Sequence, residues 1–498
     1  MLPESPLEIP EITRLVASYL DGKDLARCVQ VSKKWRHLFL FHRWRVVRVG
    51  SKHPSTRSGS SHCRIGPHPS GIYHHRHLIQ ELSLFGDTAG LEKYNYPILG
   101  KLTVDYQIGA EDPEREVFLE LTDMFPSLIY LAVLRIKLTP PSWSALSAHP
   151  RIMCLSLCNM EIKVTDAPQF WEVCKKLEGL TLTDVAIRGG TISTGVVFNR
   201  LNILEITTHH GEVANTQDQL DLILRCPSLV HMFWCDSRTI GADKHPNINT
   251  NCIPKGWWPH LQRLHITLNL RSTEMASILE GIGDEHGKLT HLELNGCFLK
   301  NQGSRALRSH FATLVKLDLA DCRYVSSRIF RDVLCSCPNL EILCAKGVLA
   351  RDLVAGGPWV CHRLRKLSIC FLFGESEQDL QQEIFGRLST LSRLVQLTMH
   401  TPKHQSYEEE GRLEFRLENG LDQLASLQQL TSLSFDKENG PHIPQLGKDE
   451  VVWMLANWKK LTIISGKLND DPREDQRLKD ALQLLGVKVK SGLSQHGT

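Results

Sequence analysis

The sequence predicts an α/β protein in which a short helical head precedes a long solenoid of parallel strands and return segments. Two observations predict it: one apolar pattern recurs along most of the 498 residues, whereas the first 48 residues have helical periodicity. Hydrophobic residues make up 42% of the chain and charged residues 23%, as is typical of a folded protein. No apolar run reaches the ~18 residues of a membrane helix, and the N-terminus has no signal-peptide pattern. We therefore expect no membrane partner.

The recurring pattern carries leucine or another apolar residue at its first, fourth and sixth positions. The last two positions are two residues apart, so they share one face of a strand, which a single strand cannot bury. Stacking the copies side by side builds a parallel sheet around a ladder of leucines. Fifteen copies, about 27 residues apart on average, begin at Ile79, Leu99, Leu128, Ile152, Leu177, Leu201, Leu229, Leu261, Leu289, Leu314, Leu340, Leu364, Leu394, Leu430 and, most weakly, Leu461.

This spacing is the period of leucine-rich repeats. Two return segments, Phe330–Leu334 and Leu380–Phe385, have helical spacing, and Cys226 and Cys337 each stand three residues before a first leucine. The region 77–466 thus resembles the cysteine-containing leucine-rich repeat, which implies a horseshoe whose cysteines are small buried packing residues. The alternative is a set of unrelated amphipathic elements with chance leucines. Fifteen cysteines without a secretory signal indicate reduced thiols and a cytoplasmic or nuclear location.

The head, residues 1–48, predicts three short helices. Asp21-Gly22 indicates the end of the first helix, and Asp24 and Ser32 can cap the second and third. The first helix is expected to be amphipathic, with one apolar face formed by Ile12, Leu15, Val16, Tyr19 and Leu20. A Ser-, Gly- and His-rich linker is predicted at 49–76 and a capping helix with a tail at 467–498.

The order of motifs in the head resembles the F-box motif over about 40 residues. The motifs are Ile9-Pro10-Glu11-Ile12, Tyr19-Leu20-Asp21, Asp24-Leu25, Val31-Ser32-Lys33-Lys34-Trp35 and a late Trp44, and the opening is one residue shorter than the family's Leu-Pro-x-Glu-Ile. With the repeats, the chain is similar to F-box proteins with C-terminal leucine-rich repeats, of the fungal type. That resemblance implies a head bound to the Skp-type adaptor on the cullin scaffold of a ubiquitin ligase, and repeats that hold a target protein.

A head of this size is too small to bury much surface, so we expect a partner to complete its core. The apolar residues exceed what three short helices can hide from water. The alternative is that they pack against the first repeat. The expected contacts with the Skp-type subunit are Ile9, Pro10, Ile12, Leu20, Leu25, Val31 and Trp35.

The second half of the head is basic. Six cationic residues and no acidic residue occur between positions 33 and 48. They could steer the head towards an acidic partner surface or form a solvated face. Nucleic acid is a less favoured partner, because aromatic platforms are not interleaved with the charges. The six residues are Lys33, Lys34, Arg36, Arg43, Arg45 and Arg48.

The residues between the strand leucines are expected to line the concave face of the repeats. This row contains an aromatic segment beside an acidic one, which predicts contact with a target protein over about 205–318. The alternative is that these are ordinary exposed strand residues. The predicted contact residues are Glu205, Phe233, His265, Glu293 and Asp318.

Motifs for catalysis are missing from the sequence. It contains no phosphate-binding loop, no nucleophile elbow and no His-Glu-x-x-His motif. The histidines and the cysteine between His62 and His77 lack paired zinc spacing. We therefore predict a non-enzymatic adaptor without cofactor or metal. The rival hypotheses are a leucine-rich scaffold or inhibitor without a ubiquitin role, and a hydrolase carried on a solenoid.

Overall fold

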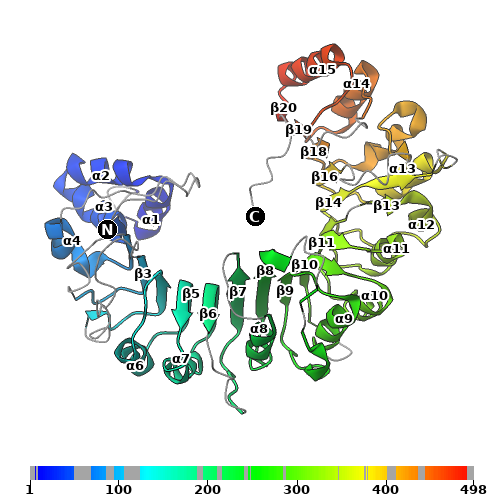
Figure 1. Cartoon of the computed structure of the whole chain (residues 1–498). Helices are drawn as coiled ribbons and strands as arrows, with labels where there is room; N and C mark the ends of the chain where they lie inside the picture. The colour runs from blue at the N-terminus through cyan, green and yellow to red at the C-terminus, as the bar shows by residue number, and fades with distance from the viewer. Residues whose placement is uncertain are drawn as a thin grey trace. The chain divides into compact units, whose positions relative to one another are not determined.

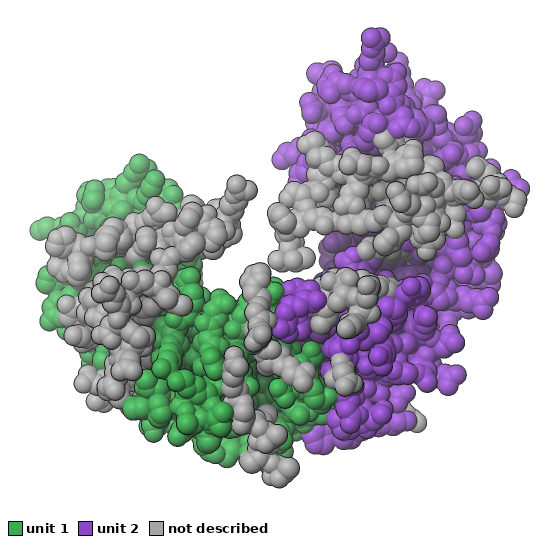
Figure 2. All heavy atoms as spheres, viewed as in Figure 1, with its two compact units in different colours: residues 1–229 green, residues 230–498 purple. Residues whose placement is uncertain are grey.

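The computed structural model describes residues 6, 9–49, 69–85, 95–105, 124–187, 195–209, 216–239, 245–246, 248–283, 288–345, 347–374, 377, 379–400, 411–435 and 444–490. They belong to two compact units, Met1–Leu229 and Val230–Thr498 (Figure 2). Most of the predicted linker lies outside the described residues. Within the described ranges, no helix combines the length and the hydropathy needed to cross a membrane.

Unit 1 begins with the three predicted helices, α1 Pro10–Tyr19, α2 Gly22–Val31 and α3 Lys33–Trp44. They pack around a small core of their own. Partly buried side chains, among them Val16, Leu20 and Trp35, surround this core. Its buried members are Ala17, Leu25, Val29 and Phe39.

Side-chain caps set where the second and third helices of the head begin. The carboxylate of Asp21 accepts a hydrogen bond from the backbone N–H of Asp24 at 2.8 Å, so Asp21 caps α2 and Gly22 is its first residue. The prediction that Asp24 is the cap was wrong. An aspartate is typical both of the capping position and of the first turn of a helix, so the sequence pattern does not show which of Asp21 and Asp24 is the cap. The Ser32 hydroxyl accepts from the N–H of Trp35 at 3.1 Å, as predicted.

A parallel sheet follows the head in unit 1, with each strand paired to the next along the chain. Its first strand lies in the segment predicted as the end of the head. The strands are β1 Val46–Val49, β2 Glu81–Phe85, β3 Lys101–Asp105, β4 Tyr130–Leu134, β5 Cys154–Ile162, β6 Gly179–Ile187 and β7 Ile203–Thr208. One buried ladder crosses all seven described strands: Val47, Leu82, Leu102, Leu131, Leu155, Leu180 and Leu204.

Helices return the chain between these strands, and α6 and α7 lie along one side of the sheet in Figure 1. The ammonium of Lys176 closes the C-terminal end of α6. Its Nζ donates to the carbonyl oxygens of Leu146, Ser147 and His149 at 2.5, 2.8 and 2.7 Å. The helices of this part are α4 Pro69–His75, the 3-10 helix η2 Arg76–Leu78, α6 Pro140–Ala148, α7 Ala167–Cys174 and α8 Thr216–Ile223.

Unit 2 contains ten described strands of the same kind. They are β8 His231–Asp236, β9 Arg263–Thr267, β10 His291–Phe298, β11 Lys316–Arg323, β12 Ile342–Cys344, β14 Lys366–Ile369, β16 Gln396–Met399, β18 Ser432–Phe435, β19 Ile463–Ser465 and β20 Lys488–Lys490. Each pairs in parallel with the next strand named, so Met232, Leu264, Leu292 and Leu317 align. Taking both units together, every predicted copy of the pattern forms a strand, including the weakest one at Leu461.

The return segments of unit 2 are mostly short helices, and α9 to α12 lie on one side of its strands (Figure 1). The predicted helices at 330–334 and 380–385 are confirmed as α11 and α13. A small second sheet joins β13 Val348–Leu349, β15 Phe371–Phe373 and β17 Gly411–Arg412. The helices are α9 Ser272–Glu280, α10 Asn301–Arg308, α11 Ser327–Ser336, α12 Ala350–Val354, α13 Leu380–Ser389, α14 Lys448–Asn457 and α15 Pro472–Leu484, with 3-10 turns η4 Ser237–Thr239, η5 Thr250–Cys252, η7 Leu417–Asn419 and η8 Leu421–Ser426.

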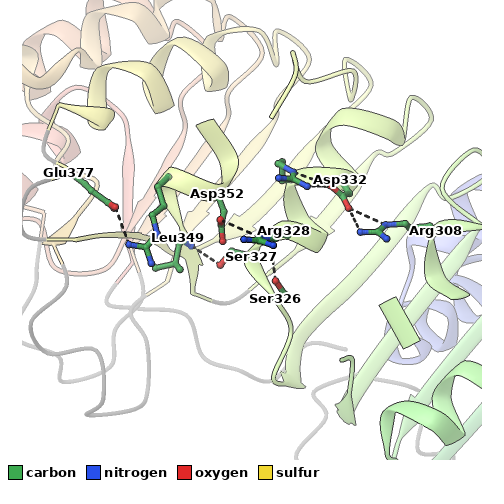
Figure 3. Close-up of polar contacts among 10 residues, drawn as sticks. Arg308, Ser326, Ser327, Arg328, Asp332, Leu349, Asp352 and Glu377 are labelled. Carbon is green, nitrogen blue, oxygen red and sulfur yellow. Dashed lines mark hydrogen bonds and ion pairs between the residues drawn. The ribbon is translucent and has the colours of Figure 1, made fainter. Parts of the chain in front are cut away.

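Ion pairs connect successive return segments of unit 2 (Figure 3). Asp332 on α11 binds Arg308 on α10, and Arg328 on α11 lies 3.9 Å from Asp352 on α12. On the next repeat, Arg351 lies 3.3 Å from Glu377. Such partly exposed pairs contribute little each, but they hold neighbouring helices in one register.

Cys226 and Cys361 are buried packing residues, as the resemblance implied. The thiol of Cys361 donates to the carbonyl oxygens of Leu334 and Cys337, at 3.3 and 3.1 Å, where α11 ends. Cys226 donates to Leu222 at 3.2 Å at the end of α8. A thiol is small enough to sit between two repeats and still satisfy a carbonyl that the helix leaves without a partner.

Candidate functional site

The first helix of the head turns part of its apolar surface outwards. Thr13 and Ala17 are buried against the other two helices, whereas the Leu15 side chain is 58% exposed and Tyr19 is 83% exposed. Ile12, which is half-buried, lies three residues before Leu15 on the same helical face. We call Ile12, Leu15 and Tyr19 the α1 face. It is an apolar strip that the described part of the chain leaves in contact with water.

The structure divides the residues predicted to contact the Skp-type subunit. Val31, at the end of α2, is 63% exposed, but Leu25 is only 6% exposed and belongs to the core of the head. Leu25 therefore packs mainly against the other helices of the head. The side chain of Pro10 lies outside the described residues. The half-buried members of the set are Ile9, Ile12, Leu20 and Trp35.

Leu15 and Tyr19 are candidate contacts that sequence reasoning missed. We expected them only to share one apolar face of the helix with Ile12, Val16 and Leu20. One feature of the sequence could have indicated that they are exposed. The apolar face of α1 is wider than the part of a helix surface that two short neighbouring helices can bury. Small residues, Thr13 and Ala17, form the centre of the buried side instead.

In unit 2 the structure aligns four of the five predicted target contacts on adjacent strands. Phe233 pairs with His265, His265 with Glu293, and Glu293 with Asp318, across β8 to β11. We call these four residues the strand row. Glu205 belongs to β7 in unit 1, where it is exposed and accepts a hydrogen bond from Thr181 at 3.1 Å.

Direct contacts connect the strand row. The Phe233 and His265 rings stack with centroids 4.3 Å apart, and Nε2 of His265 lies 2.9 Å from the Thr267 hydroxyl. Glu293 lies between an imidazole and an ammonium group, 3.6 Å from Nδ1 of His265 and 2.7 Å from Nζ of Lys316. His265 and Lys316 hold the pKa of Glu293 at about 2, although partial burial acts in the opposite direction. The row is therefore pre-formed and largely charge-compensated.

A second row on the same face was missed by sequence reasoning. It occupies the first position of each strand, two residues before the strand row, so its side chains point to the same side of the sheet. His231, Arg263, His291 and Lys316 align across β8 to β11. We call them the basic row. Arg263 and Lys316 carry the positive charge of this row, whereas burial, followed by these two neighbours, lowers the pKa of His291. Positive charge beside Phe233 suits a target surface that carries carboxylates around an apolar contact.

The described residues contain little that could support catalysis. No group of three histidine, cysteine or acidic side chains within these ranges could hold a metal ion. Burial raises the pKa of the Cys297, Cys344 and Cys361 thiols to about 12, which makes thiolate chemistry unfavourable there.

The order of strands and return helices defines the class of protein, a stack of leucine-rich repeats preceded by a three-helix head. Residues 10–47 match a family model described as F-box-like. Among solved structures, the chain is similar to a leucine-rich-repeat protein of Leptospira interrogans, with 13% identity and a TM-score of 0.45 over 83% of this chain and 90% of that one. No curated protein matches the sequence significantly. An F-box-like domain joined to leucine-rich repeats is the arrangement of a protein-interaction adaptor.

Proposed function

We propose that the protein is a non-catalytic substrate-recognition subunit of an SCF-type cullin–RING ubiquitin ligase. In this proposal the head binds the Skp-type adaptor, which connects it to the cullin. The repeats bind a target protein, so that an attached conjugating enzyme can reach its lysines by proximity alone. The free thiols of the described cysteines are compatible with the reducing cytoplasm or nucleus where such a ligase acts.

The single observation that carries the proposal is the α1 face within an F-box-like domain. F-box domains generally bind Skp-type subunits, and here Leu15 and Tyr19 present apolar surface to solvent inside residues 10–47. Exposed aromatic and aliphatic anchors of this kind contribute most of the free energy of binding, roughly 2 kcal/mol or more for each one truncated. Val31, Ile9 and Ile12 would add to the same interface.

The strand row and the basic row are the proposed target-binding surface. Glu293 is already paired with Lys316, which leaves Arg263 and Asp318 as exposed or half-exposed charges for an incoming protein. Phe233 supplies an apolar contact on β8, next to the strand of Arg263 and at the end of the row away from Asp318. A target with acidic residues around one apolar side chain would match this arrangement.

The test is affinity purification of the full chain with two matched variants. Leu15→Asp/Tyr19→Asp should lose the Skp-type subunit and the cullin together and keep the target proteins. Phe233→Ala/Arg263→Glu should show the reverse. Each variant serves as the folding control of the other. Retention of all partners by the head variant would favour a leucine-rich scaffold without a ubiquitin role.

A further inference from the structure

A cavity of about 400 Å³ lies where the head joins the first two strands of unit 1. Its lining includes Ala17 and Leu25, which belong to the core of the head. Its walls come from α1, the start of α2, the end of α3, β1 and β2. The volume is in the range of sites for small ligands.

Arginines dominate the walls of this cavity. Arg14 comes from α1, Arg43 from the last turn of α3, Arg45 from the junction with β1, and Arg48 from β1 itself. The backbone holds Arg45 in place, because its carbonyl oxygen accepts hydrogen bonds from the N–H groups of Gln80 and Glu81, both at 2.9 Å. Three of the six basic residues at positions 33–48 therefore face one cavity, while Lys33, Lys34 and Arg36 do not line it.

These four guanidinium groups have no carboxylate partner within the described part of the chain. Two acids also line the cavity, Asp21 and Glu81, and Asp21 is engaged in capping α2. Burial, followed by Arg45 and Arg14, lowers the pKa of His42, which lines the same wall. Four arginines against two acids leave a surplus of two positive charges around one opening.

The geometry points to a binding site for a phosphomonoester. Such a group carries about one and a half to two negative charges at neutral pH. This charge roughly balances the two positive charges by which the arginines exceed the acids around the cavity. Guanidinium forks match its oxygens in bidentate geometry. The cavity spans the head and the first two strands, so a bound phosphate contacts both and stabilises their junction.

The experiment uses the full chain and calorimetric titration with phenyl phosphate, with phenyl sulfate as the singly charged control. Phenyl phosphate should bind at least fivefold more tightly than phenyl sulfate. Arg14→Gln/Arg48→Gln should weaken phenyl phosphate binding at least tenfold. Lys23→Gln/Lys33→Gln removes the same charge from exposed positions outside the cavity, and should change the affinity less than twofold.

Two results would overturn the assignment. Equal affinity for the sulfate and the phosphate in the native chain would exclude a site for a doubly charged anion, independently of any variant. Equal losses in the two double variants would show attraction to the general positive charge of the head. Glycerol 3-phosphate and a pentapeptide with a central phosphoserine then show whether a free metabolite or a phosphorylated side chain is the better source of the group.

Discussion

Nζ of Lys316 lies 2.7 Å from Oε1 of Glu293 on the neighbouring strand, and Nδ1 of His265 lies 3.6 Å from the other oxygen of that carboxylate. One of the two carboxylates that looked acidic in the sequence, that of Glu293, is therefore compensated in the folded chain. The cation comes from the first position of the next strand, two residues before Asp318. A prediction based only on the residues between the strand leucines leaves out Lys316 and therefore misses this pairing.

The carboxyl of Glu293 should make unit 2 sensitive to acid. Its folded-state pKa of about 2 lies below the ordinary value of 4.5, so its stabilising contribution is complete above pH 4.5 and is lost as the pH falls towards 2. The side chain is 30% exposed, so after allowance for solvent screening we expect about 1 kcal/mol. Unfolding by urea at pH 6 and pH 3.5 measures it. Glu293→Gln should lose less stability over this interval than the native chain, and equal slopes would contradict the assignment.

Lys176 should matter far more than its neighbour Lys175. Lys176 donates to three carbonyl oxygens at the end of α6, whereas Lys175 forms only an exposed ion pair with Glu172 at 2.6 Å. Lys176→Met should lower the free energy of unfolding by about 2 kcal/mol, because those carbonyls lose charged donors. Lys175→Met should cost less than about 0.5 kcal/mol. Chemical denaturation of both variants compares them directly, and equal effects would contradict the capping role.

Gly466 should not tolerate a side chain. It has a φ of +104°, and a Cβ there would lie 2.1 Å from the carbonyl oxygen of Phe435. Gly466→Ala should cost more than about 2 kcal/mol of stability, since both the backbone conformation and the contact are unfavourable. Gly486 has a φ of +84° with open space around it, so Gly486→Ala measures the conformational cost alone, about 1 kcal/mol. Thermal unfolding of the two variants should separate them clearly.

Thiol labelling should distinguish packing cysteines from surface ones. Cys252 is exposed, while Cys226 and Cys361 are buried and have raised thiol pKa values. Iodoacetamide at pH 8 should modify Cys252 within minutes and leave the other two unmodified until denaturant is added. Peptide mass spectrometry reads the order. Rapid labelling of Cys226 in the native chain would mean that the stack is not closed around it.

Much of the repeat region could be predicted because each strand requires the same two inward leucines. Leu82, Leu264 and Leu433 all occupy the position that the pattern assigns to them. The end strands could not be predicted in this way. Val47 and Val489 complete the ladders, but their strands lack the leading leucine that a preceding return segment would supply.

The head shows the opposite limit. Helical periodicity found its three helices and grouped Leu15 and Tyr19 with the other apolar residues of α1. Apolar spacing cannot distinguish a face that meets the protein's own core from one that meets a partner, so it did not reveal that these two side chains are exposed. Lys176 was equally invisible, since its acceptors lie about 30 residues earlier in the chain. Side-chain contacts between repeats depend on the return segments. The lengths of these segments vary too much for the sequence to show which residues of one segment lie beside which residues of the next.

The most direct test of the account is the affinity of the purified full chain for a purified Skp-type subunit, measured by calorimetry. The native chain and Val452→Asp, which changes an equally exposed valine on α14, should bind with a Kd below about 1 μM. Leu15→Asp/Tyr19→Asp should bind at least a hundredfold more weakly, as expected for two interface anchors. No binding by the native chain, or equal binding by all three proteins, would contradict the account.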